Sequence, residues 1–239
     1  MVRFYALRVL KDYLGHAILI GLPLVLISVN LLIAEGADPN FNRPEAALFV
    51  GLVFIIMFQV FGAAYTHEGI EHDFFTPFKD RLRAAPVNPV RFLLMNIVYG
   101  TVISFLQGMV LLTFVVVVHG AAITNWVLVV LVLMAGAVFA QLLSAFVIML
   151  LKQASKAQAV ITLYAIGGTM VAGFFFPLPE NMLTEALSKY SSPIAWQMHA
   201  IDGFMAQDFG QGMLGFGLVL GAIAILLIGL YSVGKRVVE

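Results

Sequence analysis

The sequence predicts an all-α integral membrane protein whose chain crosses the bilayer six times. Apolar residues make up 62% of the 239 residues and charged ones only 11%, whereas soluble proteins have about 25% charged residues. Long stretches without Asp, Glu, Lys or Arg alternate with short charged loops. The apolar runs are continuous and lack the alternating polarity of membrane β-strands, so helices are expected.

Each predicted span is long enough to cross a membrane, because about 20 residues at 1.5 Å rise cover a hydrocarbon core of roughly 30 Å. The third uncharged stretch, 92–151, has room for two crossings and divides at the polar patch His119–Asn125. The whole chain, 1–239, is expected to form one transmembrane domain. Its predicted spans are 15–34, 46–66, 92–118, 126–151, 157–176 and 213–233.

A short helix in the membrane interface is predicted ahead of the first span. Leu7, Leu10 and Leu14 share one helical face, while Arg8 and Asp12 lie on another. A ragged extension of the first span is the alternative. The first apolar segment exceeds the roughly 7–15 residues of a signal-peptide core, so it is expected to be retained.

The distribution of Lys and Arg predicts that both termini are cytoplasmic. In that orientation the outer loops contain only two basic residues, Arg43 and Lys189, and are otherwise acidic. The cytoplasmic segments contain 11 of the 13 basic residues: Arg3, Arg8, Lys11, Lys79, Arg81, Arg83, Arg91, Lys152, Lys156, Lys235 and Arg236. This asymmetry follows the positive-inside rule. The zero net charge argues against nucleic acid as a partner.

The longest predicted cytoplasmic connection, 67–91, contains a short amphipathic helix. Thr76 followed by Pro77 is typical of an N-cap with proline in the first turn. The apolar face comprises Phe78, Leu82 and Ala85, the basic face comprises Lys79, Arg81 and Arg83, and Pro86 ends the helix. Such a helix either rests on anionic lipid or binds a cytoplasmic partner, and the residues alone favour neither.

The catalytic and metal-binding motifs that the sequence suggests all fail on spacing. His67 and His72 are five residues apart, whereas a zinc-binding helix needs a separation of four, so solvated loop side chains are expected. Gly229–Arg236 has the spacing of a P-loop, but Arg replaces the Ser or Thr that binds magnesium, and the segment continues a membrane helix. With no cysteine present, thiol chemistry is excluded. We expect no metal, cofactor or ATP site in this chain.

The interiors of the predicted spans contain no ionisable side chain. Carriers coupled to protons or ions usually place such residues within their spans, and a membrane hydrolase needs a base beside its nucleophile. A self-powered transporter and a membrane enzyme are therefore both disfavoured. The polar residues that remain either link helices or line a substrate path, for which Asn30 and Gln59 are the candidates; the others are Asn96, Gln107 and Gln141.

Two short helices in the outer leaflet are predicted between the fifth and sixth spans, within 177–212. Apolar residues from Leu183 to Tyr190 have helical spacing, and Ser192–Pro193 is a second N-cap followed by proline. Residues 194–205 are apolar but too few to span, and Trp196 suits the membrane interface. A plain surface loop is the alternative.

Two segments of the chain resemble the membrane subunits of ABC type-2 exporters, most closely the drug-export branch. They are Arg81–Val87 before the third span, and Gly173–Leu178 running on to Ser192–Pro193 after the fifth. The resemblance implies that the short cytoplasmic helix is a coupling helix that binds a separate ABC ATPase, through Phe78, Lys79, Arg81, Leu82, Arg83, Ala85 and Pro86. It also implies that the outer helices are a re-entrant pair, which includes Phe175, Phe176, Pro177, Pro193 and Trp196.

The function implied by this resemblance is that of a non-enzymatic permease subunit in the cytoplasmic (inner) membrane of a prokaryote. It would export an amphipathic or hydrophobic molecule such as a drug, antibiotic, lipid or glycoconjugate, as a homodimer or paired with a similar permease. ATP and magnesium would be bound by the partner ATPase. The alternative is a membrane-embedded assembly or interaction protein without transport activity.

Overall fold

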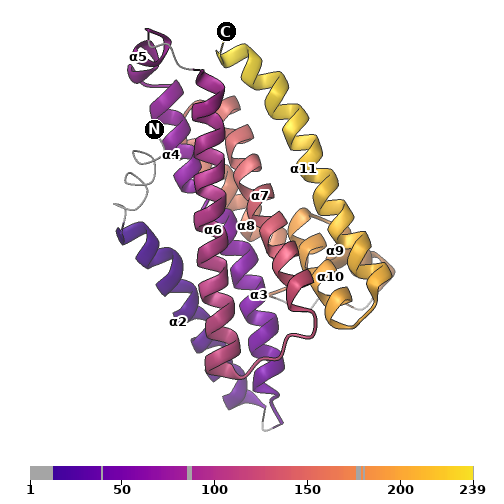
Figure 1. Cartoon of the computed structure of the whole chain (residues 1–239). Coiled ribbons are helices and arrows are strands. Elements are labelled where there is room, and N and C mark those ends of the chain that lie inside the picture. Colours follow the sequence, from indigo (N-terminus) through magenta and orange to yellow (C-terminus); the bar gives the residue numbers. More distant parts are fainter. Residues whose placement is uncertain (1–12, 39, 85–87, 176–178, 180, 239) are drawn as a thin grey trace.

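Long antiparallel helices form the protein, as the uncharged stretches predict (Figure 1). The computed structural model describes residues 13–38, 40–84, 88–175, 179 and 181–238. The long helices are α2 (Tyr13–Ala37), α3 (Arg43–Phe61), α6 (Pro89–His119), α7 (Trp126–Leu151), α8 (Ala154–Val171) and α11 (Phe209–Val238). The short ones are α4 (Ala64–Phe74), α5 (Phe78–Ala84), α9 (Met182–Tyr190) and α10 (Pro193–Met205). The predicted N-terminal interfacial helix lies outside the described residues.

Five helical segments are long and apolar enough to cross a bilayer: Tyr13–Ala37, Arg43–Phe74, Pro89–His119, Trp126–Leu151 and Phe209–Gly234. The second of them joins α3 and α4. The remaining predicted span, 157–176, corresponds to α8, which does not belong to this set. The first turns of α8 contain Ser155, Lys156 and Gln158, and these polar side chains lower its mean hydropathy. Five of the six predicted spans thus correspond to helices that are long and apolar enough to cross a bilayer.

Several helix ends lie where proline and glycine predict them. Asn88 caps α6, since its Oδ1 accepts a hydrogen bond from Val90 N at 2.9 Å and proline follows it in the first turn. The same helix ends at Gly120, whose φ of 70° lies in the left-handed region that glycine tolerates. The polar patch after it separates α6 from α7, which confirms the predicted division of the longest uncharged stretch.

Helical structure continues beyond α3 further than the sequence predicted. Residues 67–72 were expected to form a solvated loop, but they lie in α4, and His67 is buried with only 1% of its surface exposed. Ile70 and Phe74 are buried in the same helix, and burying them also takes His67 and Asp73 out of solvent. The prediction of a solvated loop was wrong. His67 and Asp73 lie just beyond the predicted span 46–66, in the helical segment that continues from it.

The apolar interior has two parts. The larger is centred on α3 and also receives buried residues of α10, such as Ile201 and Phe204. The smaller lies where α4, α6, α7 and α11 meet, around Ile70 and Leu142. Many large apolar side chains of α2 and α11 are exposed, including Leu14, and an outer surface as apolar as the core is typical of a helix bundle in lipid.

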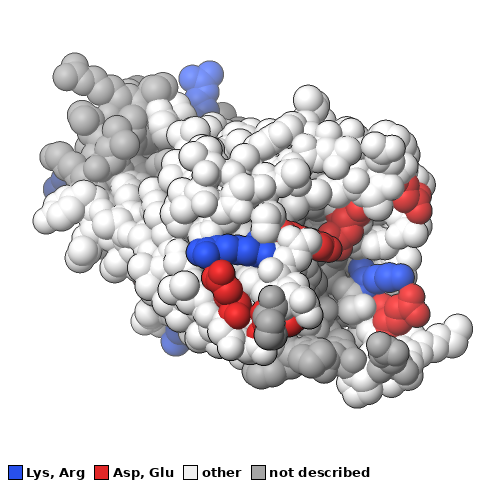
Figure 2. Space-filling view, turned by 90° about the horizontal axis from the view of Figure 1, so that it is seen from below, with Lys and Arg blue, Asp and Glu red and all other residues white. Residues whose placement is uncertain are grey.

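Charged side chains gather at the two ends of the bundle. The end that carries α5 also holds the start of α6, the connection from α7 to α8 and the end of α11 (Figure 1). Figure 2 shows the opposite end, where acidic and basic side chains lie close together on an otherwise uncharged face. Two ion pairs of the described residues are Arg43–Glu35 at 3.0 Å and Lys189–Glu185 at 2.8 Å.

Candidate functional site

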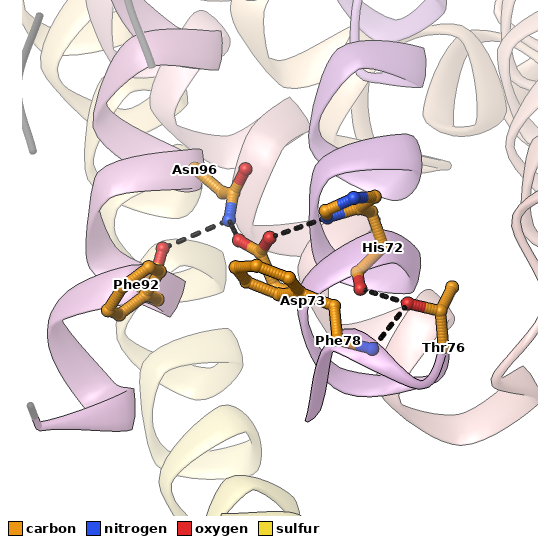
Figure 3. Close-up of polar contacts among 6 residues, drawn as sticks. All are labelled: His72, Asp73, Thr76, Phe78, Phe92 and Asn96. Atoms are coloured by element: carbon orange, nitrogen blue, oxygen red, sulfur yellow. Dashed lines mark hydrogen bonds and ion pairs between the residues drawn. The ribbon is translucent and has the colours of Figure 1, made fainter. Parts of the chain in front are cut away.

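The turn between α4 and α5 is stabilised by the threonine that the sequence identified as an N-cap. Thr76 Oγ1 donates to the carbonyl oxygen of His72 at 2.6 Å and accepts from Phe78 N at 3.3 Å (Figure 3). The helix begins at Phe78, one residue after Pro77. The predicted short helix is therefore present, and its first residue is hydrogen-bonded back to α4 through Thr76.

The residues assigned to ATPase coupling differ in their placement on α5. Phe78 is half-buried, and its ring lies 4.9 Å from the His72 ring. Lys79 is half-buried, whereas Arg81 is exposed. Leu82 and Arg83 belong to the backbone of α5, but their side chains lie outside the described part, as do Ala85 and Pro86 entirely.

Beneath α5, a buried carboxylate links α4 to α6. One carboxylate oxygen of Asp73 accepts from Asn96 Nδ2 at 3.0 Å, and the other lies 3.0 Å from His72 Nδ1 (Figure 3). The Asn96 amide also donates to the Phe92 carbonyl at 3.0 Å. Asp73 is 2% exposed, and burying a carboxylate is costly unless hydrogen bonds replace its water. These contacts supply such hydrogen bonds and fix α4 against α6; we call Asp73, Asn96 and His72 the corner cluster.

Gly69 permits the close approach on which the corner cluster depends. A Cβ at this position would overlap the Asn96 side-chain oxygen. The sequence analysis did not identify Asp73, since it belongs to no motif and its partner Asn96 is 23 positions away.

Most of the intramembrane amides link helices. Gln141 accepts from Thr66 Oγ1 at 2.5 Å and donates to Ser104 Oγ at 2.8 Å. Gln107 Nε2 lies 3.1 Å from His16 Nδ1, so α2 is tied to the middle of α6. These contacts favour the linking role over a substrate path for the residues concerned.

The two residues predicted to line a substrate path face different surroundings. Asn30 is exposed on α2 and donates to the carbonyl of Leu26 in its own helix at 2.8 Å. Gln59 is buried at 3% exposure and donates to the Leu133 carbonyl of α7 at 3.1 Å. The structure does not bring these two side chains together.

The predicted pair of short helices between α8 and α11 is present as α9 and α10. Ser192 caps α10, with Pro193 as its first residue. Trp196 Nε1 donates to the Tyr190 carbonyl at 2.9 Å, which ties α10 to the end of α9. The Phe175 ring contacts Phe54 of α3 edge-on at 6.1 Å. Phe176 and Pro177 lie outside the described residues.

A capping box that sequence reasoning missed begins α9. Asn181 Oδ1 accepts from Leu183 N at 3.1 Å and Thr184 N at 3.0 Å, and Thr184 Oγ1 accepts from Asn181 N at 3.3 Å. The Asn-x-x-Thr spacing was the available signal. Further along α9, the hydrogen bond from the Lys189 ammonium lowers the pKa of the Glu185 carboxyl.

Comparison with known proteins adds one finding. A family model described as ABC-2 type transporter matches residues 6–209, a range that includes α5, the corner cluster and both short helices between α8 and α11. No curated protein and no solved structure gave a significant match.

Proposed function

Because the chain belongs to the ABC-2 type transporter family, we propose that it is the permease of an exporter and that a separate ATPase drives it through α5. Family membership makes the chain a multi-pass membrane subunit of an ABC transporter, a subunit that lacks the ATPase site. The export direction, the residues of α5 that bind the ATPase and the substrate class belong to the proposal.

The observation that carries the proposal is the attachment of α5 to the bundle. Thr76 and the Phe78 ring connect α5 to His72, and the corner cluster connects α4 to α6. A displacement of α5 would therefore move the start of a long helix rather than a loose loop. The exposed Arg81 and Asp80 on α5 leave polar surface for a partner.

The proposed orientation places the α5 end in the cytoplasm. The described basic residues Lys79, Arg81, Arg91, Lys152 and Lys156 belong to segments at this end, in agreement with the positive-inside rule. In this proposal α8 is the sixth span, since its 18 residues cover about 27 Å. Both termini would then be cytoplasmic, and α9 and α10 would lie on the outer side.

The proposed substrate is an amphipathic or hydrophobic molecule, moved by a homodimer or by this chain with a similar permease. The apolar character of the spans and the amides and hydroxyls among their buried polar groups support this class. The resemblance to the drug-export branch supports the direction.

The test is co-purification of the ATPase with the tagged chain from its native membranes, followed by ATP-dependent transport in vesicles. Phe78→Asp should lower the recovered ATPase at least about tenfold, because a desolvated charge at a helical contact opposes association. Met182→Asp is the matched control, since Met182 is 90% exposed at the opposite end and should leave recovery unchanged.

Undiminished ATPase recovery with Phe78→Asp, at an equal amount of inserted protein, would contradict the role of α5. An ATPase that co-purifies without supporting any ATP-dependent transport would favour the assembly protein instead.

A further inference from the structure

A second buried polar contact lies where α10 packs into the bundle. Gln197 of α10 is 1% exposed and Gln59 of α3 is 3% exposed. Both side-chain oxygens lie beside Gly136 of α7: a Cβ there would overlap the Gln197 oxygen and lie 3.0 Å from the Gln59 oxygen. Two amide oxygens from different helices therefore share one small space, which we call the amide seat.

Each amide is held in its orientation by a backbone carbonyl. Gln59 Nε2 donates to the Leu133 carbonyl at 3.1 Å, and Gln197 Nε2 donates to the Pro193 carbonyl at 3.2 Å. Turning either amide around would place its oxygen against that carbonyl oxygen. Both side-chain oxygens consequently point toward Gly136, and neither has a hydrogen-bond partner among the described residues.

Two acceptors that face one space are unfavourable in an apolar interior unless they share a donor. We propose that the amide seat is an internal binding site for a small hydrogen-bond donor, a group with two N–H or O–H bonds that bridges Gln59 and Gln197. A water molecule supplies this chemistry in the closed protein. The primary ammonium group of a transported molecule supplies it when α10 has moved, and this second source rests on the proposed function.

Among the described residues the amide seat offers hydrogen-bond acceptors but no carboxylate, so it should discriminate between ligands by their N–H or O–H donors rather than by their charge. Asp73 is the one acidic residue with a buried side chain in the described part of the chain, and it belongs to the corner cluster under α5. A further unpartnered polar atom, Tyr164 Oη, lies on a ring that packs against Phe139, three residues beyond Gly136 on α7. The amide seat is thus a neutral polar site within an apolar interior.

Opening of the amide seat requires that α10 separate from α3 and α7. The glycines of α10 and α11 pack these two helices closely, since a Cβ on Gly203 would overlap Gly212 and one on Gly215 would lie 2.7 Å from the Trp196 carbonyl. We therefore expect α10 to move together with the start of α11. Such a movement would allow the bridging water to be exchanged for the ammonium group of a transported molecule.

The first experiment measures the thermal stability of the full chain in lipid nanodiscs for Gln59→Met, Gln197→Met and the double variant. If a donor bridges the oxygens, each single replacement leaves one oxygen poorly bonded and lowers Tm by about 2–4 °C. The double variant needs no donor, so its Tm should fall no further than that of a single variant. Gln211→Met, at an exposed position, is the control and should not change Tm.

The second experiment distinguishes the two sources of the donor. The chain has two tryptophans, so Trp126→Phe leaves Trp196, next to Gln197, as the fluorescent reporter. The probes are 2-phenylethylammonium and its N-trimethyl derivative, which share charge and ring but differ in N–H donors. A substrate site predicts saturable quenching by the primary ammonium alone, weakened at least about tenfold by Gln59→Met.

If the Tm changes of the two single variants do not add up in the double variant and neither probe binds, the result supports the amide seat with water as its occupant. Additive effects, or single variants that raise Tm because two repelling oxygens have been separated, would overturn the proposal. Equal binding of both probes that is insensitive to Gln59→Met would overturn the substrate source. These measurements need no ATPase. They can therefore contradict the amide seat while the proposed function stands, and the ATPase experiment can contradict the proposed function while the amide seat stands.

Discussion

Two buried polar contacts hold short helices against the long ones, and they differ in how donors and acceptors are matched. In the corner cluster under α5, each carboxylate oxygen of Asp73 has a partner, Asn96 or His72. In the amide seat beside α10, the oxygens of Gln59 and Gln197 face the same space, and the described residues supply no donor to either. The corner cluster is complete within the chain, whereas the amide seat needs a third group.

This difference indicates how each contact responds to force. Breaking the corner cluster takes the Asn96 and His72 contacts away from a buried carboxylate, which is strongly unfavourable, so α4, α5 and the start of α6 should move as one body. Opening the amide seat only releases or exchanges a small donor. We therefore expect a stiff joint under α5 and a more readily opened contact at α10.

The largest expected effect tests the stiff joint. Asp73→Ala removes the buried partner of Asn96 and His72 and should destabilise the protein by about 3 kcal/mol, measured as thermal stability in nanodiscs. Asp80→Ala, at an exposed position of α5, should stay within about 0.5 kcal/mol. A similar small effect for both variants would show that the corner cluster does not stabilise the bundle.

The next prediction compares the glycines under the two contacts. Gly69→Ala pushes the Asn96 side chain away from Asp73 and should cost about 2–3 kcal/mol, since it adds overpacking to a lost hydrogen bond. Gly136→Ala displaces a Gln197 oxygen that has no partner to lose within the described part of the chain, so it should cost less, about 1–2 kcal/mol.

Gly167→Ala is the control for both glycine replacements. Nothing lies within 4 Å of a Cβ at Gly167, so the helix propensity of alanine should raise stability by about 0.5–1 kcal/mol. If Gly136→Ala proves as costly as Gly69→Ala, the contrast between the two contacts does not hold.

The smallest expected effect tests whether α9 helps to keep α10 packed against the long helices. Asn181→Ala removes the capping box and should cost about 1 kcal/mol, confined to α9. Hydrogen exchange should speed up at the amides of α9 while those of α10 stay protected, and Asn181→Ser should restore protection. Faster exchange spreading into α10 would show instead that the capping box also secures the amide seat.

Features of the fold that depend on neighbouring residues were predictable. Ser192–Pro193 identified the start of α10, and the polar patch before Trp126 identified the break between α6 and α7. Thr76–Pro77 identified α5. Each of these signals acts within one helical turn, so no tertiary information was needed.

The prediction of a solvated loop at 67–72 was wrong because packing overrode local polarity. His67 and the acidic residues after it suggested a loop, yet Ile70 and Phe74 gain enough from burial to extend the helix and take His67 with them. The polar start of α8 left the sixth span unestablished by composition.

The candidate site was predicted only in part for the same reason. The sequence identified α5 and named Gln59, but not its neighbour Gln197, which is far away along the chain. Nor did it identify Asp73, whose partner Asn96 lies on another helix. Asn30, named for the same path, bonds to its own helix.

The sequence by itself determined that this chain is a helical membrane protein, where several of its helices begin, and which end of the bundle collects basic residues. These properties follow from hydropathy, helix capping and charge, which are set residue by residue. Only the tertiary structure decided which polar side chains contact one another and whether each hydrogen-bond acceptor finds a donor. That outcome depends on how each helix is rotated against its neighbours, and glycines such as Gly69 and Gly136 permit contacts that no local pattern encodes.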